Sequence, residues 1–387
     1  MIQSILDNDL YKFTMQQAVL DLYPEARVAY ELTNRGGTPF PPKMAREVQK
    51  KINTMASLSL TLDEKAWLED TCPYFTPAFL RFLSEYRYDP EEVSLYQEKS
   101  RLFATIKGPW YRTILWEVPL MAMISQTYFE MTAPKIMSRD DICQRNRRKA
   151  KKLASHQVSF VDFGTRRRFS FANHEDLIKE ITRLPGHTLL GTSNVHLAQK
   201  FNIAPIGTLA HEWIMFHSGL GNYKTANESA LEAWVKVYQG NLSIALTDTY
   251  TTDAFLTCFE KPRATLFDGV RHDSGDPIEF ARKIITHYQG LGIDPKTKTI
   301  VFSDSLDPDR AIDIHRFCRE KFKDIYGIGT NLTNDVGTTP LNIVIKLCQC
   351  SAGPGMPLRP TVKLSDDKGK HTGDKTELLQ CMKTLGI

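Results

Sequence analysis

The sequence contains no hydrophobic run that is long enough to cross a membrane. Its longest nearly uncharged stretch, Val118–Met131, is interrupted by Pro119, Gln126 and Glu130, whereas a membrane-spanning helix needs about 20 mainly apolar residues. The N-terminus also lacks a positively charged segment followed by an apolar one, so we expect no signal peptide. The sequence therefore predicts no membrane partner.

The pattern of cysteines that marks a disulfide framework is missing as well. The chain has seven cysteines, an odd number, without a CxxC motif, and only Cys348 and Cys350 lie close together. This usage is typical of a reducing compartment and predicts a cytoplasmic protein. The formal net charge is only +4 over 387 residues, which is too small to indicate a nucleic-acid partner.

The chain does contain enough apolar residues for a folded core, since 42% of its residues are hydrophobic. Short apolar runs alternate with helical stretches, and several are rich in Val and Ile, as buried parallel strands are. Eight such runs are present: Val158–Phe163, Thr188–Leu190, Ala204–Ile206, Ser243–Leu246, Thr265–Val270, Thr299–Phe302, Ile325–Ile328 and Ile343–Leu347. Repeated strand–helix units predict an α/β fold with an irregular (β/α)8-like barrel.

The regions outside this repeat predict a second structural unit. Leu6–Leu22 has the apolar pattern of a helix that ends before Pro24, and Val28–Thr33 alternates like a strand. We therefore expect an N-terminal α/β domain over residues 1–130 and a catalytic barrel domain over residues 131–349. The tail, residues 350–387, is expected to return to the N-terminal domain.

Polar segments follow most of the predicted barrel strands, where the catalytic groups of such barrels lie. These segments begin at Asp162, Gly191, Gly207, Thr247, Arg271, Ser303 and Gly327. Helix capping explains one or two of them. Six or seven in succession, with Arg, His and Asp among them, predict an active site.

The residue types in these segments favour a phosphorylated ligand. Gly327 and Gly329 allow backbone N–H groups to approach a phosphate, although a GxG pattern is equally common in simple turns. The run Arg166–Arg168 offers guanidinium groups to anions, with only one or two expected to point inward. Asp273, Asp276 and Asp304 are candidate carboxylates for a Mg²⁺-bound pyrophosphate. Asp276 is explained equally well as a helix cap.

His211 is the histidine that we single out. Thr208 is a candidate N-cap, which places His211 in the first turn of a helix, where a phosphate on the imidazole would be stabilised. A zinc-protease HExxH motif is excluded because its second histidine position is Met215. The basic run Arg139–Lys152 has no interleaved aromatic residues, so we interpret it as a solvated helix face.

Five motifs, in order, resemble nicotinate phosphoribosyltransferases of the bacterial and fungal type. They are Leu6-Asp-Asn-Asp-Leu-Tyr-Lys-Phe-Thr-Met15, Asp162-Phe-Gly-Thr-Arg-Arg167, Gly207-Thr-Leu-Ala-His-Glu212, Arg271-His-Asp-Ser-Gly-Asp-Pro277 and Gly327-Ile-Gly-Thr-Asn331. The resemblance implies that nicotinate, 5-phosphoribosyl 1-pyrophosphate and ATP are converted to nicotinate mononucleotide, pyrophosphate, ADP and phosphate. It also implies Mg²⁺ as cofactor, a place in NAD salvage and a homodimer with shared active sites.

The resemblance further implies roles for individual residues. His211 is expected to be the phosphohistidine, with Asp273 and Arg271 also catalytic. Nicotinate is expected to stack on Phe163, with Tyr11 of the partner subunit on its other face, and to meet Arg166 and Ser193. Phosphoribosyl pyrophosphate binding is assigned to Arg166, Arg271, Asp304, Gly327, Gly329 and Thr330. Ser193 falls where nicotinamide-using relatives have an aspartate, which would repel a carboxylate substrate.

Other functions remain as alternatives. A relative that acts on nicotinamide or quinolinate is the nearest, and quinolinate would need more cationic residues around the ring. A non-catalytic barrel that senses phosphorylated metabolites would have no use for a phosphate-accepting His211. An RNA-binding protein is opposed by the small net charge.

Overall fold

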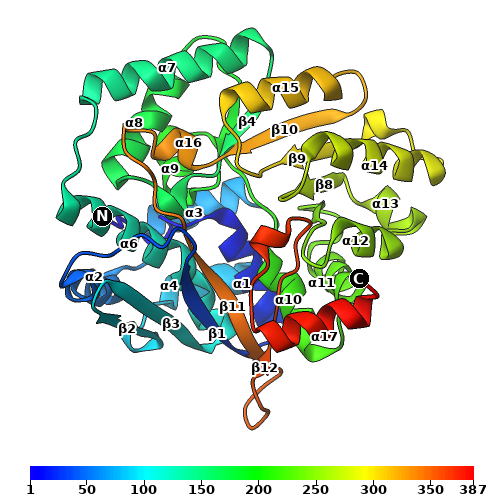
Figure 1. Cartoon of the computed structure of the whole chain (residues 1–387), viewed down its shortest axis with the longest axis horizontal. Coiled ribbons are helices and arrows are strands. Elements are labelled where there is room, and N and C mark those ends of the chain that lie inside the picture. Colours follow the sequence, from blue (N-terminus) through cyan, green and yellow to red (C-terminus); the bar gives the residue numbers. More distant parts are fainter.

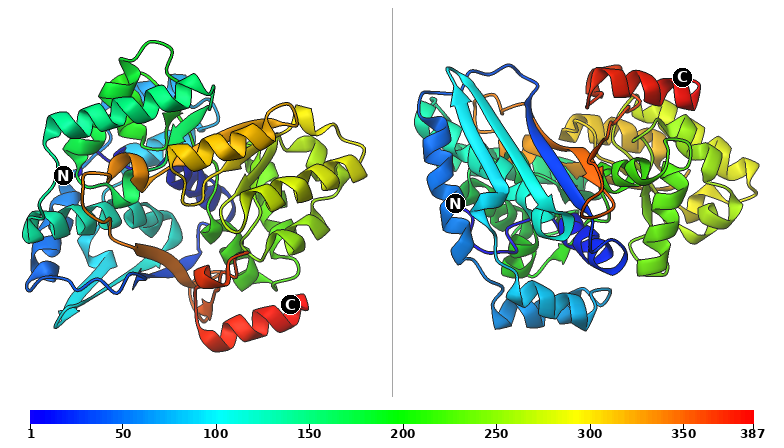
Figure 2. Two further views of the ribbon diagram at one scale, coloured as in Figure 1. Left: turned by 45° about the horizontal axis from the view of Figure 1, so that its top comes forward. Right: turned by 90° about the horizontal axis from the view of Figure 1, so that it is seen from below.

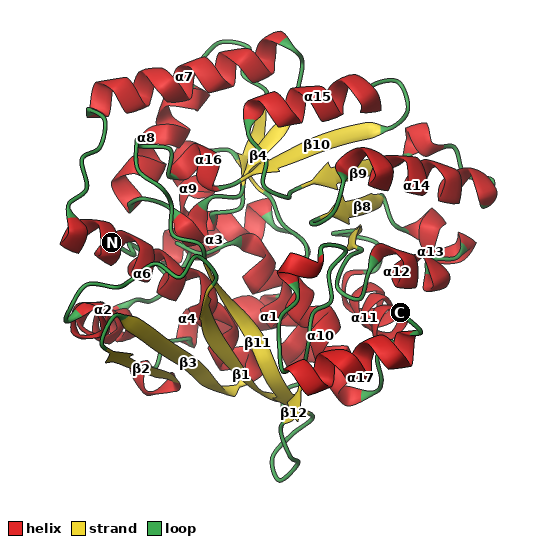
Figure 3. Cartoon of the chain, in the orientation of Figure 1, coloured by secondary structure: helices red, strands yellow, loops and turns green.

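Two β-sheets organise the chain, and the computed structural model describes all residues, 1–387 (Figures 1 and 3). The first sheet is antiparallel with the order β12-β11-β1-β3-β2. Its strands are β1 (Arg27–Asn34), β2 (Val93–Glu98), β3 (Arg101–Pro109), β11 (Ile343–Ser351) and β12 (Arg359–Pro360). The helices of this part are α1 (Leu10–Leu22), α2 (Met44–Thr54), α3 (Leu62–Thr71), α4 (Pro77–Glu85), α5 (Trp110–Thr113) and α6 (Glu117–Thr132).

The second sheet is parallel and curls into an open barrel. Its order is β6-β5-β4-β10-β9-β8-β7, so that β10 pairs with β4 and only β6 and β7 remain unpaired with each other. The strands are β4 (Phe160–Asp162), β5 (Leu189–Thr192), β6 (Ala204–Pro205), β7 (Ile244–Leu246), β8 (Gly269–His272), β9 (Thr299–Phe302) and β10 (Lys323–Ile328). This arrangement confirms the predicted α/β fold class with an irregular barrel.

Helices connect and cover these parallel strands. They are α7 (Arg139–Ser155), α8 (Phe171–Thr182), α9 (Val195–Phe201), α10 (His211–Leu220), α11 (Ala226–Tyr238), α12 (Thr252–Cys258), α13 (Lys261–Leu266), α14 (Pro277–Gly290), α15 (Pro308–Cys318), α16 (Thr330–Thr333) and, in the tail, α17 (Lys375–Leu385). None of the helices is long and apolar enough to span a bilayer.

The prediction of an eighth barrel strand at Ile343–Leu347 is wrong. This segment is β11, which pairs antiparallel with β1 from Arg27 to Asn34. Its residues alternate between buried and half-buried from Ile343 to Leu347, as expected when only one face of a strand packs on a core. Figure 2 shows from two sides that the first sheet lies beside the barrel and does not continue it.

Two further boundaries differ from the prediction. The first helix begins at Leu10, because the preceding Asp7, Asn8 and Asp9 are buried polar residues whose side chains bond elsewhere. The fifth predicted strand, Thr265–Val270, begins in the last residues of α13, and the strand itself starts at Gly269.

The tail reaches both parts of the molecule. Through β12 it joins the first sheet, as predicted. It then crosses the carboxyl ends of the barrel strands, where Leu364 N donates to Thr249 O at 3.0 Å and Asp366 accepts from Thr252 N at 2.8 Å. One continuous hydrophobic core includes residues of both sheets. The division into domains at residues 130 and 349 stays a prediction.

The basic run forms the helix α7 with ion pairs along one face. Arg145 and Lys149 both contact Asp335, at 2.6 Å each, and Lys152 pairs with Asp309. Asp335 lies just after α16, and Asp309 belongs to α15. This face of α7 is therefore ion-paired with other barrel segments and is not only a solvated surface.

Candidate active site

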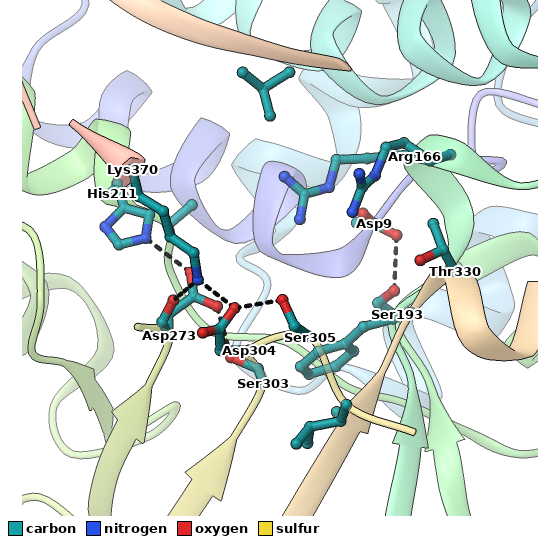
Figure 4. A pocket seen from close by; sticks show the side chains of 18 of the residues that line it. Asp9, Arg166, Ser193, His211, Asp273, Ser303, Asp304, Ser305, Thr330 and Lys370 are labelled. Atoms are coloured by element: carbon teal, nitrogen blue, oxygen red, sulfur yellow. Dashed lines mark hydrogen bonds and ion pairs between the residues drawn. The ribbon is translucent and has the colours of Figure 1, made fainter. Parts of the chain in front are cut away.

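A cavity of about 870 Å³ lies at the carboxyl ends of the parallel strands. The barrel contributes the segments that follow β4, β5, β6, β8, β9 and β10, as the sequence predicted. The first sheet contributes Lys346 and its neighbours on β11, and the tail contributes Lys363 and Lys370. The cavity therefore lies between the two sheets. Figure 4 shows Asp9, Arg166 and Ser193 on one side of it and His211, Asp273 and Lys370 on the other.

Every residue to which the family resemblance assigned a role lines this cavity. The set comprises Tyr11, Phe163, Arg166, Ser193, His211, Arg271, Asp273, Asp304, Gly327, Gly329 and Thr330. Asp276 does not belong to it. Its carboxylate accepts hydrogen bonds from the backbone of Ile278 and Glu279, both at 2.9 Å, so it is the cap of α14.

Phe163 is fixed by the strands around it. Its backbone N–H donates to Ile328 O at 2.9 Å, and its ring packs on Gly327. A Cβ atom at Gly327 would lie 2.3 Å from Phe163 Cδ2, closer than non-bonded carbon atoms approach. Gly327 is therefore required because the Phe163 ring packs directly against it. The sequence analysis explained this glycine only by phosphate binding.

Tyr11 of the same chain lines the cavity together with Phe163. Its side chain is buried and its hydroxyl has no hydrogen-bond partner. An unpaired buried hydroxyl is unusual in a folded protein. A partner subunit's contribution at this position stays a prediction, and the chain's own Tyr11 is already present.

Ser193 is bonded to a carboxylate that the sequence reading did not place in the site. Ser193 Oγ donates to Asp9 Oδ1 at 2.8 Å. Burial raises the pKa of Asp9, although Arg166 partly opposes this effect. Asp9 belongs to the first quoted motif, and although it directly precedes α1, its side chain makes no capping bond.

The three neighbouring arginines separate as expected. Arg166 and Arg167 line the cavity, whereas Arg168 is buried in a bidentate pair with Asp7, at 2.6 and 2.7 Å. Arg167 has no carboxylate partner, and burial, followed by Arg166 and Arg35, lowers its pKa to about 10. Two cations thus face the cavity and are available to an anionic ligand.

His211 is the first residue of α10, following Ala210 as N-cap. Thr208 is not the cap, because its hydroxyl donates to Ile244 O at 3.2 Å. The placement of His211 in the first helical turn is nevertheless confirmed. Its Nδ1 lies 3.0 Å from Thr249 Oγ1, and its Nε2 lies 2.9 Å from Asp273 Oδ2.

Burial, followed by the Lys363 ammonium 3.0 Å from Nε2, lowers the pKa of His211 to about 4. The imidazole is therefore neutral at pH 7 and retains a lone pair for attack on an electrophile. Lys363 also lies 3.2 Å from Asp248. The sequence identified neither Lys363 nor Asp248 as a site residue. Asp248 lies in the polar segment that begins at Thr247, but nothing in the sequence distinguishes it within that segment, and Lys363 meets His211 only in the folded chain.

Asp273 is held by several cations and donors. Burial would raise its pKa, but Arg271, His211 and Lys363 outweigh burial and hold the pKa well below its ordinary range. Ser303 Oγ donates to Asp273 Oδ1 at 2.9 Å, and Arg271 lies 3.5 Å from Oδ2. Asp304 pairs with Lys370 of the tail.

The carboxylates offer places for a hard cation. Ligand atoms of His211, Asp248 and Asp273 lie within 4.8 Å of one another, but Lys363 already balances the charge of that group. Mg²⁺ prefers oxygen ligands and is usually held by one or two carboxylates together with substrate phosphates. Asp273 and Asp304, which both line the cavity, fit this requirement.

Comparisons with known proteins agree with this geometry over the full chain. Residues 158–386 match the model of the nicotinate phosphoribosyltransferase (NAPRTase) family, and residues 6–125 match its N-terminal domain. A nicotinate phosphoribosyltransferase of Desulforapulum autotrophicum is 57% identical, with 100% of this chain and 99% of the relative covered. One from Chromohalobacter salexigens is 50% identical, with the same coverage.

Solved structures show the same fold. The crystal structure of nicotinate phosphoribosyltransferase from Porphyromonas gingivalis has a TM-score of 0.97 and 44% identity, with 100% of both chains covered. That of the enzyme from Vibrio cholerae has a TM-score of 0.92 and 36% identity, covering 100% of this chain and 94% of the other. The chain therefore belongs to the nicotinate phosphoribosyltransferase family.

Proposed function

We propose that this protein transfers the phosphoribosyl group of 5-phosphoribosyl 1-pyrophosphate to the ring nitrogen of nicotinate. The products are nicotinate mononucleotide and pyrophosphate, and the reaction is coupled to the hydrolysis of ATP to ADP and phosphate, as a step of NAD salvage. The observation that supports this most directly is one cavity with an aromatic and cationic end, at Phe163 and Arg166, and a neutral buried histidine, His211, at the other.

The aromatic end suits a flat anionic ring. Phe163 offers a stacking face, with Tyr11 beside it, and Arg166 offers a guanidinium to the carboxylate. Ser193 presents a hydroxyl where a carboxylate would repel nicotinate. The Asp9 carboxylate accepts the Ser193 hydroxyl hydrogen bond and therefore also lies near the nicotinate position. The positive charge of Arg166 offsets the negative charge of Asp9 there.

His211 suits transient phosphorylation. A lone pair of the neutral imidazole attacks the γ-phosphorus of ATP, the bond from phosphorus to the β-γ bridging oxygen breaks, and ADP leaves. Water later attacks the phosphohistidine and releases phosphate. Asp273 and the Lys363 ammonium both contact Nε2. Asp273 orients the ring, and the charge of Lys363 would stabilise a phosphoryl group carried on it.

The remaining predicted residues suit the donor. Arg271, with a buried and unpartnered Nε, and Arg166 meet the pyrophosphate, while Asp304, Gly329 and Thr330 lie along the cavity beside Gly327. Asp273 and Asp304 would hold Mg²⁺ together with the pyrophosphate. When bound, Mg²⁺ would neutralise charge on the leaving group.

We also propose a homodimer in the cytoplasm. The dimer rests on the family resemblance. All seven cysteines are unpaired in the structure, which supports the cytoplasmic location.

The test is an assay of mononucleotide formation by the purified protein from nicotinate and 5-phosphoribosyl 1-pyrophosphate, with and without ATP. We expect nicotinate mononucleotide, formed faster with ATP, and a loss of rate when EDTA removes divalent cations. Nicotinamide and carboxyl-labelled quinolinate serve as competing acceptors. Product from nicotinamide alone, or release of labelled CO₂ from quinolinate, would contradict the proposal.

A further inference from the structure

A buried cluster of three charged residues lies beneath the cavity and is not explained by the reaction as described so far. Lys12 of α1 contacts Glu117 of α6 at 2.5 Å and Glu212 of α10 at 2.7 Å. The Lys12 side chain is completely buried, and both glutamates are at most 7% exposed. The cluster therefore joins three helices at one point.

The cluster reaches the ligand cavity through its two carboxylates, since Glu117 and Glu212 both line the cavity. Glu117 uses one oxygen, Oε2, for Lys12 and the other, Oε1, for Arg166 Nη1 at 3.4 Å. Glu117 is the only carboxylate within ion-pair distance of Arg166. It is thus the connection between a fixed buried cation and a cation that faces the cavity.

The charge state of Glu117 suits this connection. Burial raises the pKa of a carboxyl group, but Lys12 and Arg166 outweigh burial at Glu117 and keep its pKa below the ordinary range. Glu212 shares Lys12 and is the carboxyl of the pair whose pKa is raised by burial. Glu117 is therefore held as a carboxylate beside Arg166.

The geometry leaves Arg166 able to bind a ligand. A guanidinium has five N–H donors, and the contact of Glu117 with Nη1 is the only hydrogen bond that Arg166 makes to a carboxylate. At 3.4 Å this contact is longer than the usual N–H···O hydrogen bond of about 2.7–3.2 Å, so it is a loose ion pair. It is therefore sufficient to orient the guanidinium, while the other donors remain available.

We propose that Glu117 is a positioning residue, anchored by Lys12, that holds the Arg166 guanidinium with its free donors toward the carboxylate of the acceptor substrate. This inference rests on the proposed role of Arg166 in nicotinate binding. Glu117 itself touches no reacting atom. Its effect is therefore expected on acceptor binding and not on the chemical step.

The test compares steady-state kinetics of wild type, Glu117→Gln, Arg166→Ala and the double variant. Glu117→Gln keeps the shape of the side chain and removes its charge. We expect the KM for nicotinate to rise about tenfold, roughly the effect of one lost charge-assisted interaction, with kcat nearly unchanged. The KM for 5-phosphoribosyl 1-pyrophosphate should rise less, because Arg271 also meets the pyrophosphate. In the Arg166→Ala background, Glu117→Gln should add little, because the two residues act in series.

Glu92→Gln is the matched control. Glu92 is also a buried glutamate, bonded to Arg112 Nε at 2.7 Å and Trp116 Nε1 at 3.0 Å, but it does not line the cavity. Its replacement should leave the KM for nicotinate unchanged. If Glu117→Gln does not fold by circular dichroism, Glu117→Asp keeps the charge but retracts it by one methylene, and the KM for nicotinate should again rise.

The outcomes separate this inference from the function. A raised KM in Arg166→Ala with an unchanged KM in folded Glu117→Gln or Glu117→Asp overturns the positioning role alone. Equal and independent effects of the two substitutions in the double variant also overturn it. An unchanged KM in Arg166→Ala overturns the role of Arg166 and this inference with it, while nicotinate mononucleotide formation still tests the overall function.

Discussion

Arg166, Arg167 and Arg168 are neighbours in the sequence with different surroundings. The sequence predicted that only one or two would face the cavity, because adjacent residues point in different directions. It could not predict which, since the carboxylates that sort them, Glu117 and Asp7, are distant in sequence. Local motifs identified the site residues of the barrel. They did not identify the residues that the tail and the first sheet bring to the cavity, such as Lys363 and Lys346.

His211 is the residue whose replacement tests the coupling to ATP. His211→Ala removes the only group proposed to accept phosphate, so ATP hydrolysis should fall roughly 100-fold or more, as expected for loss of a nucleophile. A slow, ATP-independent formation of mononucleotide should remain. His156→Ala, at the exposed end of α7, is the control. Unchanged ATP hydrolysis in His211→Ala would contradict the phosphohistidine.

The low pKa of His211 has a consequence for stability. The unfolded chain takes up a proton on this histidine as the pH falls through about 6.5, whereas in the folded protein the pKa is about 4. Above about pH 6.5 the ring is neutral in both states and does not change the free energy of unfolding. As the pH falls from about 6.5 to 4, only the unfolded state takes up the proton, so the free energy of unfolding decreases. Urea unfolding of His211→Gln should therefore show a weaker decline with falling pH than wild type. Equal declines would refute the shift.

Gly327 offers a test of how Phe163 is held. Gly327→Ala places a Cβ atom 2.3 Å from Phe163 Cδ2 and should displace the ring, lowering kcat/KM for nicotinate about tenfold or more. Gly290→Ala is the control, because a Cβ atom there meets nothing within 4 Å and helix propensity improves by up to about 1 kcal/mol. Normal kinetics in Gly327→Ala would show that the ring is not needed in this position.

At the scale of elements, hydrophobic runs predicted the seven strands of the parallel sheet and mistook one other strand for an eighth. Ile343–Leu347 is as rich in Ile, Val and Leu as the barrel strands, and a short apolar run does not specify its partner strand. Only the pairing of β11 with β1, residues far apart in sequence, decides its sheet. The start of α1 was missed for a related reason, since Asp7 and Asp9 bind side chains of the barrel.

The segment before α1 is attached to the barrel by the buried ion pair of Asp7 with Arg168. Asn194 Nδ2 also donates a hydrogen bond to Asp7 at 2.8 Å. Asp7→Asn leaves the Arg168 charge buried without its partner, and we expect a loss of about 3–5 kcal/mol in the free energy of unfolding. Asp176→Asn removes an ion pair with Arg139, whose side chain is 76% exposed, and should cost less than about 1 kcal/mol. Similar losses in urea unfolding for both variants would contradict this assignment.

At the scale of the whole molecule, one continuous core unites both sheets, and the cavity between them needs residues from each. Whether a second subunit also contributes is tested by mixing Tyr11→Ala with Arg166→Ala subunits. If sites are shared, mixed dimers contain one intact site, and about a quarter of wild-type activity should return on random mixing. If each chain uses its own Tyr11, every site lacks one residue, and mixed dimers confirmed by mass spectrometry will stay inactive.

Lys363 lies 152 positions after His211 in the chain and follows the last strand of both sheets, β12. During synthesis, earlier parts of a chain begin to fold before later parts leave the ribosome. All strands of the parallel sheet, which ends at β10 (Lys323–Ile328), can therefore pair before the ammonium that faces the histidine is synthesised. A chain that stops before Lys363 therefore has the parallel sheet of the scaffold but lacks one cation of the histidine site.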